Sequence, residues 1–136
     1  MDVRPLIKTN TLLNENEVAI LRKRKSWINI LAIALMWFQV FAAMALFIFS
    51  PGVITFLLSA LIVASKQFQM VIFMHDGAHG LIFKNRKLND FVSQWFCAYP
   101  VLTDTYSYRN IHLQHHKYTE TENDPDLSLS APFPIT

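Results

Sequence analysis

The sequence predicts an all-α integral membrane protein in which two membrane-spanning helices form a hairpin and cytosolic helices carry clustered histidines. Two observations indicate this fold class. Two long apolar stretches are separated by a short turn, and all five histidines of the 136-residue chain fall into two tight groups. The hydrophobic content is 52 %, and the net charge of only +2 gives no broad basic field for nucleic acid.

Residues 1–26 are predicted to form a cytosolic segment ahead of the first span. Asn14 can cap a short helix, because Glu17 then stands at the third helical position. The mostly polar segment is too long for the start of a cleaved signal peptide, and the apolar stretch that follows lacks an obvious cleavage site. We therefore expect that stretch to be a retained membrane anchor.

Residues 27–49 and 53–74 are predicted to cross the membrane. The first stretch carries no formal charge, and at about 1.5 Å per residue it can cover a hydrocarbon core of about 30 Å. Ser50, Pro51 and Gly52 interrupt the helix, since proline disfavours helix in the preceding residue and glycine accommodates a turn. So short a turn makes the two spans antiparallel and places both outer ends on one side.

Basic residues predict which side of the membrane that is. Residues 22–25 are all basic and precede the first span, and Lys84, Arg86 and Lys87 follow the second, whereas the turn at 50–52 is uncharged. The positive-inside rule then places both ends in the cytoplasm, at a bacterial inner membrane or the eukaryotic endoplasmic reticulum.

The apolar stretch 91–102 is too short to cross a bilayer. We expect an interfacial helix that stays at the cytosolic surface. That placement keeps the second histidine group on the same side of the membrane as the first, as a shared metal site requires.

The histidine spacings place each group on one face of a helix. His75 and His79 are separated by i, i+4, while His112, His115 and His116 are separated by i, i+3, i+4. Neutral imidazole is a common metal ligand. Five imidazoles exceed the three protein ligands of a catalytic zinc and suit a two-metal centre, although ligand type alone leaves iron, copper, nickel and zinc open.

Polar residues near the histidines are candidates to orient them through hydrogen bonds. The candidates are Asp76, Asn110, Asp124 and Asp126. Arg109 is a further residue that could orient the site, and a plain solvated turn is the alternative for residues 124–126. Gly77 and Gly80 also stand out, because glycine in a helix costs about 1 kcal/mol and a close approach by a helix or ligand would compensate.

These motifs resemble a known family. H-D-G-A-H-G at 75–80 and R-N-I-H-L-Q-H-H-K-Y-T-E-T-E-N-D-P-D at 109–126 are similar to the first and second histidine boxes of the membrane fatty acid desaturase superfamily. Carotenoid ketolases and hydroxylases share similar boxes. The resemblance covers roughly residues 53–126 and implies that residues 27–136 form part of a four-span, desaturase-like domain.

The resemblance implies a cytosol-facing, non-haem di-iron centre that activates O2 and removes hydrogen from a lipid or acyl C–H bond. The expected substrate enters from the lipid bilayer, and the expected electron donor is a ferredoxin or a cytochrome b5-type protein. By the same resemblance, the iron ligands would be His75, His79, His112, His115 and His116.

The chain departs from the family pattern at its end. Neither a second pair of spans nor a third histidine box precedes Thr136. We therefore expect an N-terminal fragment that is inactive alone.

Three other functions remain open at this point. A carotenoid ketolase or hydroxylase, or an alkane hydroxylase, would use the same boxes. An intramembrane zinc protease is suggested by the likeness of H-D-G-A-H to H-E-x-x-H, but it leaves the second histidine group unexplained. A non-enzymatic metal-binding or transport protein should place its ligands within the bilayer rather than at its edge.

Overall fold

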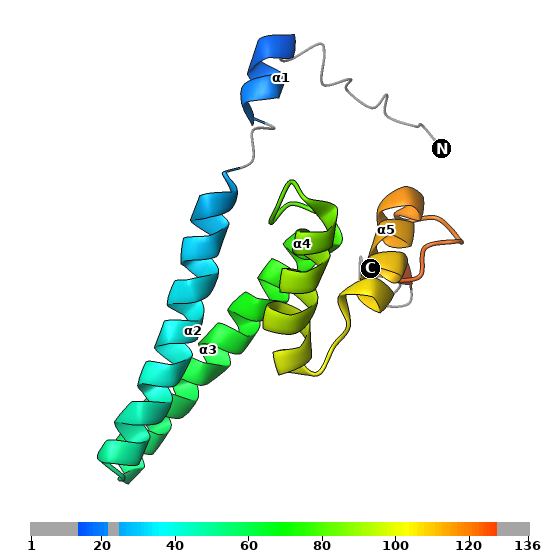
Figure 1. Ribbon diagram of the computed structural model, residues 1–136. Coiled ribbons are helices and arrows are strands. Elements are labelled where there is room, and N and C mark those ends of the chain that lie inside the picture. The colour runs from blue at the N-terminus through cyan, green and yellow to red at the C-terminus, as the bar shows by residue number, and fades with distance from the viewer. Residues whose placement is uncertain (1–13, 22–24, 128–136) are drawn as a thin grey trace.

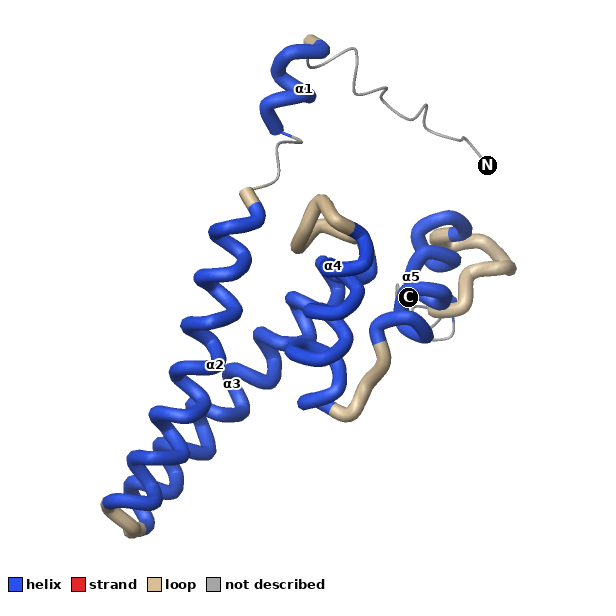
Figure 2. The backbone as a smooth tube through the Cα atoms, in the orientation of Figure 1, coloured by secondary structure: helices blue, strands red, loops and turns tan. Residues whose placement is uncertain are grey.

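A computed structural model of the protein describes residues 14–21 and 25–127, and this part of the chain is helical without any strand (Figures 1 and 2). The α-helices are α1 (Glu15–Leu21), α2 (Ser26–Phe49), α3 (Val53–Ala78), α4 (Arg86–Val92) and α5 (Thr105–Tyr118). A π-helical segment, η2 (Ser93–Ala98), and a 3₁₀ turn, η3 (Tyr99–Val101), continue directly from α4. The predicted all-α class is confirmed.

Helix α1 begins with the capping arrangement that the sequence predicts. The Glu17 backbone N–H donates to Asn14 Oδ1 at 2.9 Å, and the Asn14 N–H donates to Glu17 Oε2 at 2.8 Å. Residues 22–24 of the basic run lie outside the described part of the chain.

Helices α2 and α3 form the predicted antiparallel hairpin. They contain 24 and 26 residues, and both are long and apolar enough to cross a membrane. The second helix continues past residue 74, where the predicted membrane-spanning stretch ends, to Ala78. Near the turn, the Thr55 hydroxyl donates to the Ser50 carbonyl oxygen at 2.6 Å and so stabilises the start of α3.

The hairpin buries a narrow contact surface and exposes most of its apolar residues. Met36, Val40, Met70 and Met74 belong to a buried cluster that also includes Ile82, Phe83, Cys97 and Ala98. Elsewhere in the hairpin, the buried Ser59 hydroxyl donates to the Ala43 carbonyl of α2 at 2.7 Å. Large apolar side chains cover the outer faces, among them Leu31, Phe38, Phe41, Phe56, Leu61 and Phe68. Such an extensive apolar surface suits a lipid environment rather than water.

The expected interfacial helix at 91–102 is longer than predicted, because the helical segment begins at Arg86 and ends at Val101. The Asn85 side chain caps its start by accepting a hydrogen bond from the Leu88 N–H. Its polar residues Asn89 and Ser93 face inward and are buried, whereas its aromatic residues face outward. The exposed aromatic residues are Phe91, Trp95, Phe96 and Tyr99.

Helix α5 begins after Leu102, whose φ of 57° turns the chain. The Asp104 side chain caps α5 by accepting a hydrogen bond from the Ser107 N–H at 2.7 Å. The helix lies beside α4 and η2, on the side away from α2, and packs against the end of α3 (Figure 1). The fold thus brings the last turn of α3 next to α5, although more than thirty residues separate their histidines.

Candidate metal centre

The first histidine pair lies where α3 ends. His75 is in the last turn of the helix, and His79 is the residue that follows its final residue, Ala78. His79 keeps nearly helical backbone angles, and the helix stops because Gly80 adopts a φ of 71°. Glycine tolerates this left-handed conformation at a helix end better than other residues do.

Four of the five predicted ligands converge on one point. The ligand atoms of His75, His79, His112 and His116 all lie within 4.8 Å of one another. The Nε2 atom of His112 is 2.9 Å from Nε2 of His79 and 3.0 Å from Nε2 of His116. Two imidazoles from the end of α3 and two from α5 therefore bring their ring nitrogens to a shared volume.

The cluster is compatible with metal binding, because four imidazole nitrogens, each a common metal ligand, lie close together. The two separations of 2.9 and 3.0 Å are hydrogen-bond distances between imidazole rings.

The surroundings of His112 favour its neutral form. Burial, together with the neighbouring imidazoles of His75, His116, His79 and His115, lowers the pKa of His112 to about 4. At neutral pH its lone pair is therefore available to a metal.

Tyr108 orients the His112 ring. The Tyr108 ring stacks on the imidazole at a centroid distance of 4.9 Å, and the phenol oxygen lies 3.3 Å from Nδ1 of His112. In the tautomer that binds metal through Nε2, the Nδ1–H group donates to that phenol oxygen.

His115 lies outside the four-histidine group. Its Nδ1 atom is 2.8 Å from Asp124 Oδ1 and 3.7 Å from Asp126 Oδ2, and the hydrogen bond with Asp124 raises the pKa of His115. Asp124 is only 6 % exposed and also accepts hydrogen bonds from the Glu120 and Asp126 backbone N–H groups. This geometry excludes a plain solvated turn at Asp124.

The other two candidates differ in their positions. Asp76 Oδ1 is 3.6 Å from His75 Nδ1, so this carboxylate lies beside the His75 ring at a half-buried position. Asn110 is exposed and forms no hydrogen bond with a histidine in the described part of the chain.

Gly77 permits the close packing that the sequence predicts. A Cβ atom at this position would collide with the Ser93 side chain of η2. The glycine between the two histidines therefore allows η2 to rest directly on the last turn of α3.

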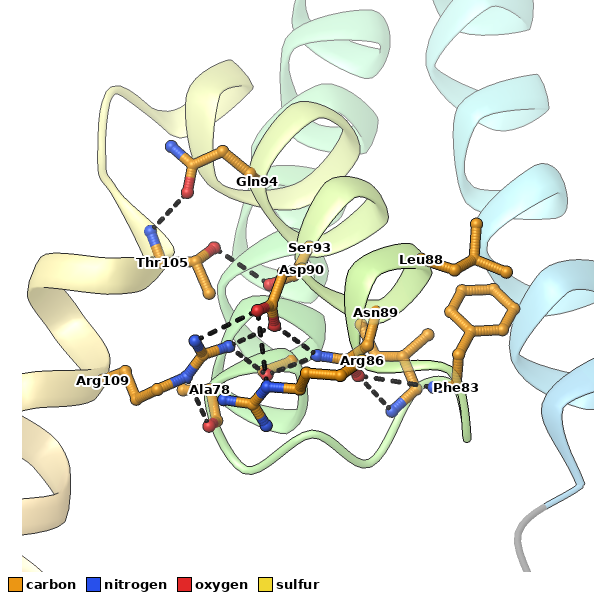
Figure 3. A network of polar contacts seen from close by, with 12 residues as sticks. Ala78, Phe83, Arg86, Leu88, Asn89, Asp90, Ser93, Gln94, Thr105 and Arg109 are labelled. Carbon is orange, nitrogen blue, oxygen red and sulfur yellow. Dashed lines mark hydrogen bonds and ion pairs between the residues drawn. The ribbon is translucent and has the colours of Figure 1, made fainter.

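The structure adds polar residues that the sequence did not single out. Asn89 and Asp90 of α4 contact Arg109 or the backbone beside His75 and His79 (Figure 3). The sequence did contain one sign of these contacts, because Asn89 and Ser93 are four residues apart in a segment that is rich in aromatic residues. Their partners lie far along the chain, so that spacing could not identify the contacts.

Comparisons with known proteins agree with this geometry. The sequence profile of a family described as "Fatty acid desaturase" matches residues 51–135, which is more than half of the chain and includes both histidine groups. The chain is also 34 % identical over 74 residues to dihydrorhizobitoxine desaturase of Bradyrhizobium elkanii, across 53 % of this chain and 21 % of that protein. It thus spans about a fifth of that relative's length. No solved structure matches.

The family match accounts for both parts of the structure. Two apolar helices of membrane-spanning length lead into a nitrogen-rich cluster compatible with metal binding. These features indicate a membrane protein of a desaturase-type oxidoreductase family, and the chain belongs to the fatty acid desaturase family.

Proposed function

We propose that this chain forms part of an iron-dependent, oxygen-using enzyme that desaturates the acyl chain of a membrane lipid. One observation carries the proposal. Four imidazoles, from elements far apart in the sequence, meet within 4.8 Å at one end of a hairpin long enough to span a bilayer. That position allows an acyl chain to arrive from the membrane while the ligands remain at its aqueous edge.

The proposed topology has both ends of the hairpin at the cytoplasmic face. The antiparallel pairing of α2 and α3 supports a shared side (Figure 1). The basic residues Lys84, Arg86 and Lys87 are exposed just beyond the second span, which favours the cytoplasm for that side. A ferredoxin or a cytochrome b5-type protein would deliver electrons there.

In this proposal, His75, His79, His112 and His116 hold iron, and His115 belongs to a second iron position. Bound iron would supply the activation of O2 and the removal of hydrogen from the lipid C–H bond. Tyr108 would fix the orientation of His112, and Asp124 would do the same for His115. The donor protein supplies the electrons that O2 takes up beyond those removed from the lipid.

The zinc-protease alternative is less compatible with this arrangement. It assigns no role to His112 and His116, which lie against the first pair of histidines.

The test is lipid oxidation by the intact enzyme of which this chain forms part, purified from membranes in detergent and supplied with Fe²⁺, an electron donor and deuterium-labelled phospholipid. We expect O2-dependent formation of a double bond, detected by mass spectrometry. His112→Ala should abolish it, and Gln114→Ala, at an exposed position on the same helix, should not.

A hydroxylated or ketonic product would assign the site to another reaction of the same superfamily. Peptide hydrolysis without O2, or bound metal without any lipid oxidation, would contradict the proposal.

A further inference from the structure

We propose that Arg109 is a positioning residue that fixes the end of α3 against α5, and thereby sets the separation between the two pairs of histidines. The inference rests on the proposed metal centre for its consequence. Its structural basis is a set of contacts that do not involve the histidine side chains.

The guanidinium of Arg109 binds the backbone between His75 and His79. Its Nε–H donates to the Ala78 carbonyl at 2.8 Å, and its Nη2–H donates to the Gly77 carbonyl at 3.0 Å. Carbonyls in the last turn of a helix lack donors within the helix, and a cation there interacts favourably with the helix dipole. Arg109 therefore provides a donor to the Ala78 carbonyl and a further donor to the Gly77 carbonyl, which also accepts from the Gly80 N–H at 2.9 Å.

The same residue belongs to the helix that carries the second histidine group. Arg109 lies one turn before His112 on α5. Within the described residues, it provides the side-chain hydrogen bonds from α5 to the backbone between His75 and His79. A single side chain thus connects the two helices from which the four ligands project.

Asp90 and Asn89 of α4 hold the guanidinium in place. Arg109 Nη2 donates to Asp90 Oδ1 at 2.6 Å, and Asn89 Nδ2 donates both to that carboxylate and to the Gly77 carbonyl (Figure 3). Arg109 is 9 % exposed and Asn89 is fully buried. Burial and a planar set of donors favour one orientation of the guanidinium over several.

A second set of bonds secures the start of α5 but does not reach α3. Gln94 Oε1 accepts from the Thr105 N–H at 2.9 Å, and the Ser93 and Thr105 hydroxyl oxygens lie 2.9 Å apart. These bonds attach the first turn of α5 to η2. Arg109 then sets how the next turn, with His112, meets His79 across a nitrogen–nitrogen separation of 2.9 Å.

The experiment compares Co²⁺ binding by the intact, detergent-solubilised protein with that of four variants. Arg109→Met removes the donors but keeps an extended side chain, and Arg109→Lys restores a single charged donor. Asp90→Asn removes the charge that holds the guanidinium. Arg86→Met is the matched control, because Arg86 contacts the same carboxylate at 3.3 Å from an exposed position.

We expect Arg109→Met to bind Co²⁺ about 10- to 100-fold more weakly than the wild-type protein, with an altered visible absorption spectrum. Arg109→Lys should recover part of the affinity, Asp90→Asn should lose less than Arg109→Met, and Arg86→Met should match the wild type. In metal-free protein, Arg109→Met should also accelerate amide hydrogen exchange at residues 77–82, whereas Arg86→Met should not.

Wild-type affinity and spectrum in a folded Arg109→Met variant would overturn the proposal. If that variant does not fold, Asp90→Asn decides, and wild-type binding by it would overturn the proposal as well. Failure of the wild-type protein to bind Co²⁺ would contradict the metal centre instead. Amide hydrogen exchange at residues 77–82 would then test the positioning role of Arg109 separately. Exchange unchanged in Arg109→Met would reject that role. If Arg109→Met does not fold, unchanged exchange in Asp90→Asn would reject it.

Discussion

His112 is oriented by Tyr108 on one side of its ring and presents Nε2 to two other histidines on the opposite side. Its lowered pKa, about 4, keeps the imidazole neutral at neutral pH. A neutral ring with one nitrogen engaged by a phenol has the electronic form that a metal ligand requires. At the residue scale, the site is therefore prepared for a cation by burial and by hydrogen bonding together.

Asp124→Asn should weaken the contribution of His115 to metal binding. The substitution keeps the shape of the side chain but removes the charge that accepts from Nδ1 of His115 at 2.8 Å. We expect about a 10- to 100-fold loss of affinity for metal held by His115, measured by Co²⁺ titration. Asp126→Asn is the matched control, and its 3.7 Å separation from His115 predicts a smaller effect. Equal losses of Co²⁺ affinity in the two variants would contradict the role of Asp124 in orienting His115.

The Asp90 carboxylate makes the stability of the folded protein depend on pH in the acidic range. Burial alone would raise the pKa of its carboxyl group, but hydrogen bonds from Arg109 and Asn89 and the charges of Arg109 and Arg86 lower that pKa below its usual value. A carboxyl with a depressed folded-state pKa adds stability above its unfolded pKa, and this stability is lost as the pH falls through the folded pKa.

The stability advantage of the wild type over Asp90→Asn should therefore be constant near neutral pH and shrink below about pH 4. Thermal unfolding in detergent between pH 7 and pH 3 measures this difference. A stability difference between the wild type and Asp90→Asn that does not change with pH would show that the carboxylate charge contributes nothing to stability.

At the scale of elements, the segment from α4 to η3 has its polar side inward and its aromatic side outward. Buried Asn89, Ser93 and Gln94 bond to α3 and α5, while Phe91 and Trp95 remain exposed. This inversion of the usual soluble pattern is expected where the outer face contacts lipid. The segment acts as the structural link between the hairpin and the helix that carries the second histidine group.

Gly77→Ala should disturb that link. The added methyl group would collide with the Ser93 side chain, and overpacking of this kind costs about 1–3 kcal/mol. Gly52→Ala is the matched control, because its nearest neighbour, Thr55 Oγ1, would lie at 3.6 Å, and we expect a change within about 0.5 kcal/mol.

Thermal unfolding in detergent measures both glycine variants. Combining Gly77→Ala with Ser93→Gly should recover part of the lost stability, since it removes the side chain that would collide. Equal effects of the two single glycine substitutions would contradict the packing at Gly77.

At the scale of the whole molecule, local patterns predicted the hairpin and the histidine faces well. Hydropathy located both apolar helices, and α3 continues past the apolar stretch that ends at residue 74 to carry the first histidine group. The i, i+4 spacing within each group places His75 with His79 and His112 with His116, and the fold brings these four imidazoles together.

The remaining features depend on contacts between distant parts of the chain. The bonds from Arg109 to Gly77 and Ala78 join residues more than thirty positions apart, and no period in the sequence reports them. His115 illustrates the same limit, because its spacing is compatible with the shared cluster, yet the turn that places Asp124 beside it draws it into a separate pair.

The topology of the whole molecule can be tested by labelling introduced cysteines with a membrane-impermeant maleimide. Lys84→Cys and Asn123→Cys should react only from the cytoplasmic side, and Pro51→Cys in the turn only from the opposite side. The native Cys97 is buried and should give little background. Reaction of the turn and of position 84 from the same side would contradict a spanning hairpin.

The central claim is that His75, His79, His112 and His116 surround one metal ion. X-ray absorption at the iron edge of the iron-loaded, intact protein tests it most directly, because imidazole rings give a distinctive scattering pattern. We predict a coordination shell dominated by imidazole nitrogen, with fewer imidazoles or no bound iron in His112→Ala. A shell without imidazole, or a spectrum and iron content unchanged by His112→Ala, would contradict the account.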